Sequence, residues 1–187
     1  MKHPLILASS SPRRQYLMHE AGFNFTVEKP DVEESFPDDL PVEQVARYLA
    51  NKKAEYFRKD LHNQIIVTAD TVVILDGEIM NKPADRKEAI TMLSRLSGKT
   101  HLVMTGVCIL SAEKEESFDD TTEVTFRKLT LEEIEFYVDQ YKPYDKAGAY
   151  GAQDFIGMIA IEKIKGSYFN VMGLPIHKVY EHLKSWA

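Results

Sequence analysis

The sequence is poor in cysteine, and it lacks both a long apolar run and an excess of positive charge. Cys108 is the single cysteine in the 187 residues, so no internal disulfide can form, and its apolar surroundings favour a buried structural thiol over a reactive one. No apolar stretch approaches the roughly 18 residues of a membrane helix. The apolar run near the N-terminus is too short for a signal peptide. We therefore expect a cytoplasmic protein that does not bind a membrane.

The charge balance and the missing motifs exclude further classes of function. A net charge of −6 argues against a nucleic-acid partner, because such partners favour a basic surface. A small anion stays compatible, since a local cluster of cations can outweigh the average. The histidines are scattered without ligand spacing, which argues against a histidine metal site. Neither a Walker A loop nor a G-x-S-x-G elbow occurs.

What remains is the composition of a soluble globular protein, with 44% hydrophobic and 28% charged residues. We expect one domain over 1–187, which is long enough to bury a core without the support of disulfides or metal ions. Periodicity and capping residues predict helices over 12–21, 41–61, 84–98, 130–141 and 174–186. Apolar runs predict strands over 4–8, 64–80 (two strands around an Asp76-Gly77 turn), 100–110, 121–129 and 155–164. The loose alternation favours an α/β fold with a mixed sheet.

The segment "ILASSSPRRQYLM" places two arginines in the first turn of a predicted helix. A serine caps this helix and Pro12 stands near its first position. Acidic residues are usual there, because the helix dipole already presents positive charge. Arg13 and Arg14 fit the site if an anion such as a phosphate chain is shared between them. The alternative, two solvated surface arginines, is equally compatible with this segment alone.

Asp70 interrupts the apolar run "IIVTADTVVIL". A carboxylate is a poor strand former and is costly to bury unpaired. A metal ion, a lysine or a water to be activated accounts for it, whereas the structural alternative is a turn or bulge in which Asp70 bonds its own backbone. The β-branched residues on both sides favour the functional interpretation.

Two lysines and an acidic loop are less specific signals. Lys53 falls on the apolar stripe of its predicted helix, where snorkelling of the ammonium to water is the commoner outcome. Lys82 by itself fits a solvated loop, and Glu34 fits a solvated acidic loop. Together, the cations and the isolated carboxylates indicate phosphate-ester or anhydride chemistry with a hard cation held by oxygen ligands.

At this point the motifs resemble a known family. "LASSSPRR", "LANKKA", "TADTVV", "NKPAD", "LSGKTH", "YDKAGAYGAQ" and "GSYFNVMGLP" are similar, in order, to segments of the Maf family of nucleoside triphosphate pyrophosphatases. The resemblance implies a mixed α/β fold with two lobes around a cleft, like that of inosine-triphosphate pyrophosphatases. It also implies cleavage of the α–β anhydride of a nucleoside triphosphate, a divalent cation (Mg²⁺ or Mn²⁺) and a homodimer.

The resemblance also implies roles for individual residues. Asp70 matches the catalytic carboxylate, as the base for the attacking water, as a metal ligand, or as both, and Glu34 matches a second carboxylate linked to the metal. Positions that hold the triphosphate match Ser9, Arg13, Lys53 and Lys82. Positions that distinguish the branch cleaving dTTP and UTP match Arg13, Thr71 and Gln153.

Three questions stay open at this stage. The 7-methyl-GTP branch of the family is an alternative to the dTTP/UTP branch. A nucleotide-binding regulator of septum formation without turnover is a second alternative, although a pure binder does not need the Asp70 base. Arg14 lies along the helix with Leu17 and Met18, so it is expected to brace a loop or to pair with an acidic side chain rather than to contact substrate.

Overall fold

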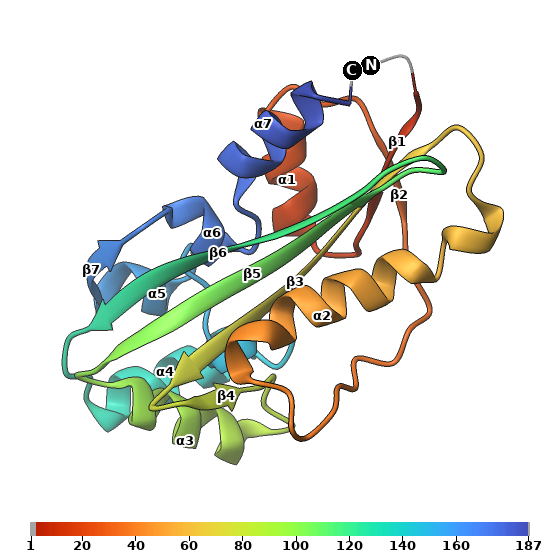
Figure 1. Ribbon diagram of the computed structural model, residues 1–187. Helices are drawn as coiled ribbons and strands as arrows, with labels where there is room; N and C mark the ends of the chain where they lie inside the picture. Colours follow the sequence, from red (N-terminus) through yellow and green to blue (C-terminus); the bar gives the residue numbers. More distant parts are fainter. Residues whose placement is uncertain (1–2, 187) are drawn as a thin grey trace. The chain divides into compact units, whose positions relative to one another are not determined.

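The computed structural model describes residues 3–186 and divides them into two compact units (Figure 1). Unit 1 contains residues 3–71, 105–120 and 173–186, and unit 2 contains residues 72–104 and 121–172. Three long strands contribute residues to both units, namely β3 (Ile65–Leu75), β5 (Thr100–Leu110) and β6 (Glu115–Phe126). The expectation of a single domain over 1–187 stays a prediction.

Unit 1 holds the N-terminal elements and the last helix. Besides its parts of the long strands it contains β1 (Leu5–Ala8), α1 (Pro12–Glu20), β2 (Thr26–Glu28), α2 (Val42–Glu55), a 3-10 turn (Arg58–Asp60) and α7 (Ile176–Lys184). The predicted second helix is therefore shorter than 41–61, because the backbone tightens into the 3-10 turn after Tyr56. β2 is a short strand inside the segment that the sequence indicated as a plain connection.

Unit 2 holds the remaining elements. It contains β4 (Glu78–Met80), α3 (Arg86–Leu96), α4 (Leu131–Tyr141), a 3-10 turn (Ala147–Ala149), α5 (Phe155–Ala160), β7 (Ile161–Lys165) and α6 (Tyr168–Met172). The Asp76-Gly77 turn is confirmed, with both residues at positive φ as a tight hairpin requires. The capping box of Thr130 and Glu133 is confirmed at the start of α4.

The predicted strand over 155–164 is wrong in its first half. Residues 155–160 form α5, and only 161–165 pair with β6. A continuous apolar run does not distinguish a buried strand from a buried helix. The residues buried in α5 are Ile156, Gly157 and Ala160, a helical spacing, whereas Met158 is 72% exposed. A Cβ at Gly157 would lie 2.3 Å from the Ala152 carbonyl oxygen, so the missing side chain lets this helix close onto its preceding loop.

The strands form one mixed sheet in the order β2-β1-β3-β5-β6-β7, with β4 paired to β3. β1 runs parallel to β2 and to β3, and its register with β3 aligns Leu7 with Val67. The same offset of sixty places Ser9 level with Ala69. The mixed α/β fold class predicted from the sequence is confirmed.

In unit 1, the even-numbered strand residues form the sheet face that packs on α2. Side chains alternate between the faces of a strand, and one apolar cluster joins this face to the buried side of the helix. Its members are Ile6, Ala8, Ile66, Cys108 and Leu110 from the strands and Ala50, Ala54 and Phe57 from α2 and the turn after it. Cys108 is fully buried, and burial raises the pKa of its thiol to about 11, which agrees with the structural role expected of it.

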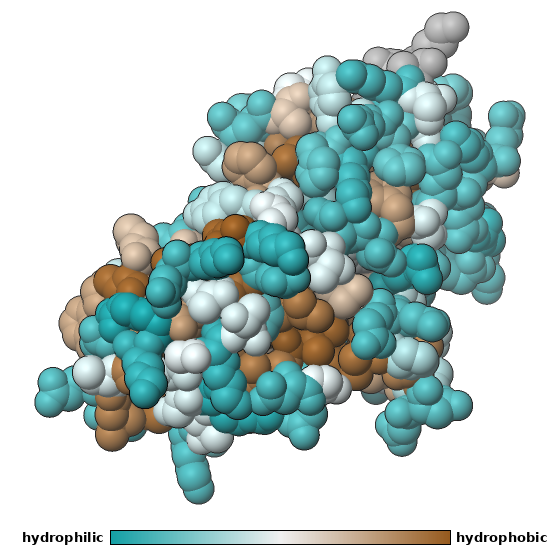
Figure 2. Space-filling view, turned by 60° about the vertical axis from the view of Figure 1, so that its left-hand side comes forward, coloured by the Kyte–Doolittle hydropathy of each residue, from teal (hydrophilic) through white to brown (hydrophobic). Residues whose placement is uncertain are grey.

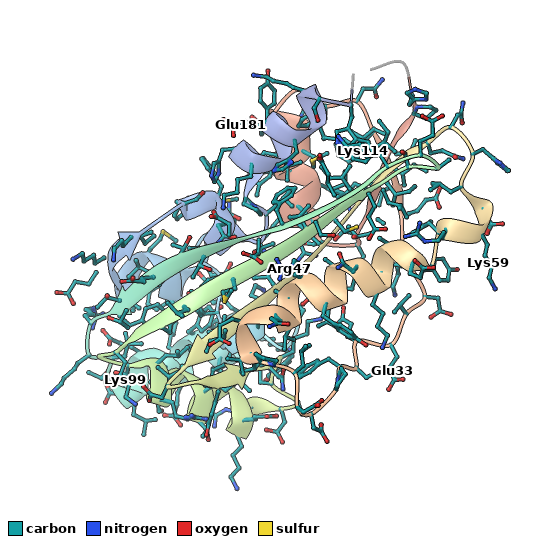
Figure 3. The ribbon with its side chains drawn as sticks, viewed as in Figure 1. Glu33, Arg47, Lys59, Lys99, Lys114 and Glu181 are labelled. Atoms are coloured by element: carbon teal, nitrogen blue, oxygen red, sulfur yellow. The ribbon has the colours of Figure 1, made fainter. Side chains whose placement is uncertain are left out.

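The face shown in Figure 2 is mainly hydrophilic and also carries apolar patches. Glu33, Arg47 and Lys59 are exposed charged residues of unit 1 (Figure 3). Within residues 3–186, no helix combines the length and the apolar character that crossing a membrane requires.

The helix α2 lies close against the sheet at one glycine. A Cβ at Gly106 of β5 would lie 2.3 Å from the Arg47 nitrogen and 2.4 Å from the Ala46 carbonyl carbon. These are backbone atoms, so no side-chain movement relieves the clash. Gly106 therefore sets the distance between α2 and the sheet.

We expect Gly106→Ala to lower the free energy of unfolding by about 3 kcal/mol, the upper end of the range for overpacking, because the helix backbone must shift. Gly22→Ala is the control: its Cβ meets no atom within 4 Å, but its φ of +80° is unfavourable for alanine, with a cost of about 1 kcal/mol. Urea unfolding followed by circular dichroism measures both. Equal stability of the two variants would contradict this account of the α2 contact.

Candidate active site

The first turn of α1 is built as the sequence indicates. Ser11 is the N-cap, and its hydroxyl accepts a hydrogen bond from the Arg14 backbone N–H at 3.5 Å, while Pro12 opens the helix. Ser9 precedes it at the end of β1 and is buried. Its hydroxyl accepts a hydrogen bond from the Ser11 backbone N–H at 3.2 Å. Hydroxyls and backbone N–H groups therefore gather at the start of this helix, the arrangement that binds anions in proteins.

A side-chain bond on the α2 face aligns that helix with β3. The Thr68 hydroxyl donates to the Ala50 carbonyl at 2.7 Å. Asp70 lies two residues beyond Thr68, on the same face of the strand. Lys53 lies three residues beyond Ala50, on the same face of the helix. The bond between Thr68 and Ala50 thus places Lys53 opposite Asp70.

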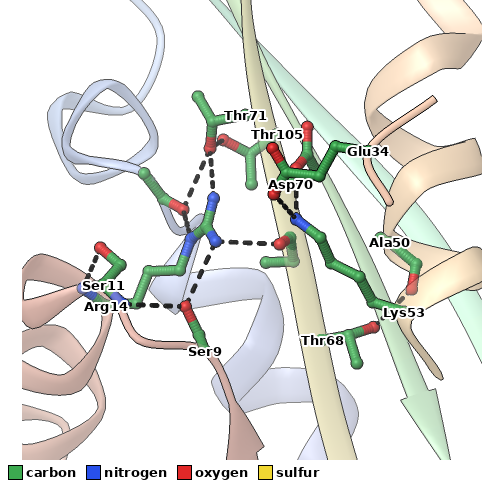
Figure 4. A network of polar contacts seen from close by, with 12 residues as sticks. Ser9, Ser11, Arg14, Glu34, Ala50, Lys53, Thr68, Asp70, Thr71 and Thr105 are labelled. Atoms are coloured by element: carbon green, nitrogen blue, oxygen red, sulfur yellow. Dashed lines mark hydrogen bonds and ion pairs between the residues drawn. The ribbon is translucent and has the colours of Figure 1, made fainter. Parts of the chain in front are cut away.

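Lys53 lies between two carboxylates (Figure 4). Its ammonium donates to Asp70 Oδ1 at 2.5 Å and is 2.9 Å from Glu34 Oε1. The side chains of Lys53 and Asp70 are 10% and 11% exposed, whereas that of Glu34 is 46% exposed. This cluster joins α2, the middle of β3 and the connection between β2 and α2.

These contacts decide between the alternatives that the sequence left open. Snorkelling of Lys53 is wrong, because its ammonium is buried on Asp70 rather than in water. A turn or bulge at Asp70 is also wrong, because β3 is continuous from Ile65 to Leu75. Glu34 belongs to an exposed acidic connection, as expected, but it also carries the ion pair to Lys53.

The donor set at this cluster fits a divalent metal that shares its ligands with a substrate. Glu34 and Asp70 offer carboxylate oxygens, which suit a hard cation. Among residues 3–186, no group of three or more histidine, cysteine, aspartate or glutamate side chains is arranged to hold a metal. One or two carboxylates completed by water and phosphate oxygens is the usual site for Mg²⁺.

Arg14 lies on the opposite side of β3 from Lys53 and holds four backbone or hydroxyl oxygens (Figure 4). Its Nε donates to the Gly173 carbonyl at 2.7 Å, its Nη1 to the Ala69 carbonyl at 2.9 Å and to Ser9 Oγ at 3.4 Å, and its Nη2 to Thr71 Oγ1 at 3.0 Å. Burial lowers the pKa of this guanidinium, and the negative charge of Asp70 acts in the opposite direction. The expected bracing role is confirmed, whereas no acidic side chain bonds to Arg14 among residues 3–186.

Arg13 has a different environment. Its side chain is half-buried, and it has no hydrogen-bond or ion-pair partner within residues 3–186. The two arginines that looked alike in the sequence are therefore distinct. Among residues 3–186, the Arg13 guanidinium donates no hydrogen bond, whereas that of Arg14 donates four.

Two of the residues singled out from the sequence belong to unit 2. Lys82 is exposed on the connection between β4 and α3, and Gln153 is exposed just before α5. Within unit 1, the structure brings Glu34, Lys53 and Asp70 into one cluster, and it brings Ser9 and Thr71 together through Arg14. The roles of Lys82 and Gln153 as substrate-binding residues stay predictions.

Three contributors to the site were missed from the sequence. Thr68 aligns α2 with β3, Thr105 bonds the Thr71 hydroxyl at 2.9 Å, and Gly173 supplies a carbonyl to Arg14 and Thr71. The alternation of residues along β3 was a usable signal for Thr68, which shares a face with Asp70. The Gly173 carbonyl leaves no comparable signal, because a backbone acceptor is available at every residue.

Comparisons with known proteins give matches over nearly the whole chain. A family model described as "Maf-like protein" matches residues 4–186. A protein of Phocaeicola vulgatus named dTTP/UTP pyrophosphatase is 49% identical over 98% of this chain and 96% of its own length. A Bacteroides thetaiotaomicron protein of the same name is 47% identical with the same coverage, and one of Cytophaga hutchinsonii is 44% identical over 96% of this chain and 83% of its own.

Solved structures show the same fold at low sequence identity. The Ham1 protein of Staphylococcus aureus has a TM-score of 0.57 at 16% identity and covers 98% of this chain and all of that one. A HAM1 protein of Coxiella burnetii has a TM-score of 0.55 at 13% identity, over 98% and 99% of the two chains. These likenesses support the fold class and carry nothing about the site.

The buried ion pair gives a test of the geometry. We expect Lys53→Met to lower the free energy of unfolding by about 3–5 kcal/mol, because Asp70 is left as a buried charge without its partner. Asp70→Asn costs less, since Glu34 still pairs with Lys53. The two effects are coupled because the two side chains are in contact. The loss of unfolding free energy in the Lys53→Met/Asp70→Asn variant is therefore expected to be smaller than the sum of the two single losses by at least about 1 kcal/mol.

The neighbouring lysine is the matched control for this cycle. Lys52 donates to the Ser35 carbonyl at 2.8 Å on the exposed side, so Lys52→Met changes stability by only about 0.5 kcal/mol. Urea unfolding at pH 7 measures all four variants. A Lys53→Met protein as stable as Lys52→Met would show that the ion pair does not exist in solution.

Proposed function

The chain belongs to the Maf family, and from this premise we propose that it is a nucleoside triphosphate pyrophosphatase that hydrolyses the α–β phosphoanhydride of dTTP and UTP to the monophosphate and pyrophosphate. The observation that carries the proposal is the Glu34–Lys53–Asp70 cluster beside an anion-binding helix start. A pure nucleotide binder has no need of a buried, lysine-paired carboxylate, whose burial is unfavourable without a function.

Asp70 acts as the base in this proposal. Its carboxylate accepts a proton from the attacking water, the water oxygen forms the new bond to phosphorus, and the bond to the bridging oxygen breaks. Lys53 Nζ donates to Asp70 Oδ1 at 2.5 Å and orients this carboxylate before substrate arrives. The same ammonium is positioned to share its charge with a phosphate oxygen.

The remaining cations and donors hold the triphosphate. Arg13 supplies a guanidinium that grips two phosphate oxygens at once, and Ser9 and the backbone N–H groups of the α1 start donate to the chain. Lys82 is proposed as a further cation that binds the triphosphate. Phosphoryl transfer depends mainly on this kind of positioning and charge neutralisation.

The proposal includes a divalent cation, Mg²⁺ or Mn²⁺, held by the carboxylates of Glu34 and Asp70. When bound, such an ion neutralises charge on the phosphates and polarises the phosphorus centre. The oxygen donors of the two carboxylates support this part of the proposal, because hard cations prefer such ligands.

Selection of the base is assigned to Gln153; Arg13 and Thr71 are the other two positions that match those distinguishing the dTTP/UTP branch. The amide of Gln153 donates and accepts at the same time, which matches the O4 and N3–H edge shared by thymine and uracil. Hydrogen-bonded readout discriminates strongly, because a wrong base leaves buried polar groups unpaired. The names of relatives that are 44–49% identical support dTTP and UTP as the substrates. The proposal further takes the protein to act in the cytoplasm as a homodimer in nucleotide housecleaning.

A panel of nucleoside triphosphates with a pyrophosphate readout tests this function. We expect dTTP and UTP to be cleaved with kcat/KM at least about 100-fold above that for ATP and GTP, on the scale of discrimination by hydrogen bonding. EDTA abolishes the activity, and Mg²⁺ or Mn²⁺ restores it. A best rate with 7-methyl-GTP would move the chain to the other branch, and binding of dTTP without pyrophosphate release would make it a regulator.

The Asp70→Asn variant tests the base. We expect kcat to fall at least about 100-fold, the scale of a lost general base, while the variant stays folded. Asp76→Asn is the matched control, because Asp76 is an exposed turn residue paired with Lys99 at 2.8 Å, and it is expected to keep full activity. Near-normal turnover by Asp70→Asn excludes Asp70 as the base.

A further inference from the structure

Arg14 and Thr71 form a polar network on the face of β3 that points away from Lys53. Side chains alternate along a strand, so Asp70 faces α2 while its neighbours Ala69 and Thr71 face α1 and Gly173. Figure 4 shows this division, with the Arg14 guanidinium on one side of β3 and the Lys53 ammonium on the other. The network therefore bonds to β3 on both sides of Asp70 in the sequence, at Ala69 and Thr71, from the face opposite to Lys53.

The guanidinium of Arg14 has almost no donor left for a ligand. Of its five N–H groups, four are used by Gly173, Ala69, Ser9 and Thr71. A bidentate grip on phosphate needs two free N–H groups on one edge. Arg14 is thus excluded from the kind of phosphate contact that Arg13 can make.

The hydroxyl of Thr71 is similarly committed. Its oxygen accepts from Arg14 Nη2 at 3.0 Å, lies 2.9 Å from Thr105 Oγ1 and donates to the Gly173 carbonyl at 3.2 Å. One hydroxyl has a single proton and two lone pairs. These three contacts use its full capacity, so nothing remains for a hydrogen bond to a nucleotide base.

We propose that Arg14 and Thr71 are positioning residues, which fix the Asp70 carboxylate and the Ser9 hydroxyl relative to each other without contacting the substrate. Arg14 clamps the carbonyl before Asp70 and the side chain after it, and the same guanidinium reaches Ser9 at the end of β1. Two parts of the site, the base on β3 and the anion-binding turn after β1, are thereby held by one planar group. The inference rests on the proposed function and deepens it, since Thr71 then affects catalysis through the position of Asp70 and not through contact with the substrate.

The first test separates positioning from substrate contact. We expect Arg14→Lys, which keeps the charge but loses the planar fork, to lower kcat about 100-fold, the effect of a misplacement of about 1 Å, with KM for dTTP changed less than about threefold. Thr71→Val removes the shared hydroxyl and lowers kcat by a similar factor for dTTP, UTP and ATP alike. Thr71→Ser keeps the hydroxyl and restores most of the activity.

A double-variant cycle tests whether the two residues act together. Because both belong to one network, Arg14→Lys combined with Thr71→Val is expected to lose no more activity than the more impaired single variant. Arg127→Lys is the matched control: Arg127 also braces backbone, with Nε on the Ile159 carbonyl at 2.6 Å and Nη1 on the Lys128 carbonyl at 2.8 Å, but in unit 2. The Arg127→Lys variant is expected to lose thermal stability but to keep kcat within about twofold of the wild-type value.

Each outcome supports or overturns the inference. A Thr71→Val effect confined to dTTP and UTP, or a raised KM with unchanged kcat, shows direct contact and overturns it. Multiplicative losses in the double variant overturn the shared network. If Arg14→Lys does not fold, the Thr71→Val and Thr71→Ser pair decides alone. Wild-type protein that cleaves no triphosphate overturns the proposed function, whereas active wild-type protein with a fully active Arg14→Lys overturns this inference only.

Discussion

The contact between Lys53 and Asp70 is the constraint to which the rest of unit 1 conforms. A carboxylate in the middle of a buried strand is unfavourable unless a cation reaches it, and the ammonium of α2 does so at 2.5 Å. This requires α2 to lie close to the sheet, which Gly106 permits by having no side chain. It also requires the correct axial position of the helix, which the hydrogen bond from Thr68 to Ala50 fixes.

β3 separates two kinds of polar chemistry by the alternation of its side chains. The even face carries the charged cluster around Lys53, and the odd face carries the neutral and guanidinium contacts around Arg14. One strand can therefore carry the Asp70 carboxylate, the proposed base, on one side and be held by Arg14 on the other. Rigid support of this kind is what a catalytic group needs, because small displacements reduce its effectiveness strongly.

Local signals in the sequence were sufficient for most elements. Ser11 and Pro12 marked the start of α1, Asp85 that of α3, and the Thr130 and Glu133 box that of α4. These signals act within one helical turn, so they do not depend on the remainder of the chain. The strand predicted from the apolar run at 155–164 was wrong in its first half because this run contains no local signal that decides between strand and helix. Its periodicity fits both a strand and a helix, and packing of Gly157 onto the Ala152 carbonyl decided for the helix.

The sequence by itself determined that Asp70 needs a partner, that a serine-capped helix begins at Pro12 and that two arginines stand in its first turn against the local preference. Those conclusions follow from propensities and solvation, which depend on residue type. Only the tertiary structure decided that Lys53 is the partner of Asp70. It also decided that Arg14 bonds to the protein, whereas Arg13 has no hydrogen-bond or ion-pair partner among the described residues. Neighbouring side chains on a helix diverge by about 100°, and what each one meets depends on segments as distant in the chain as Gly173.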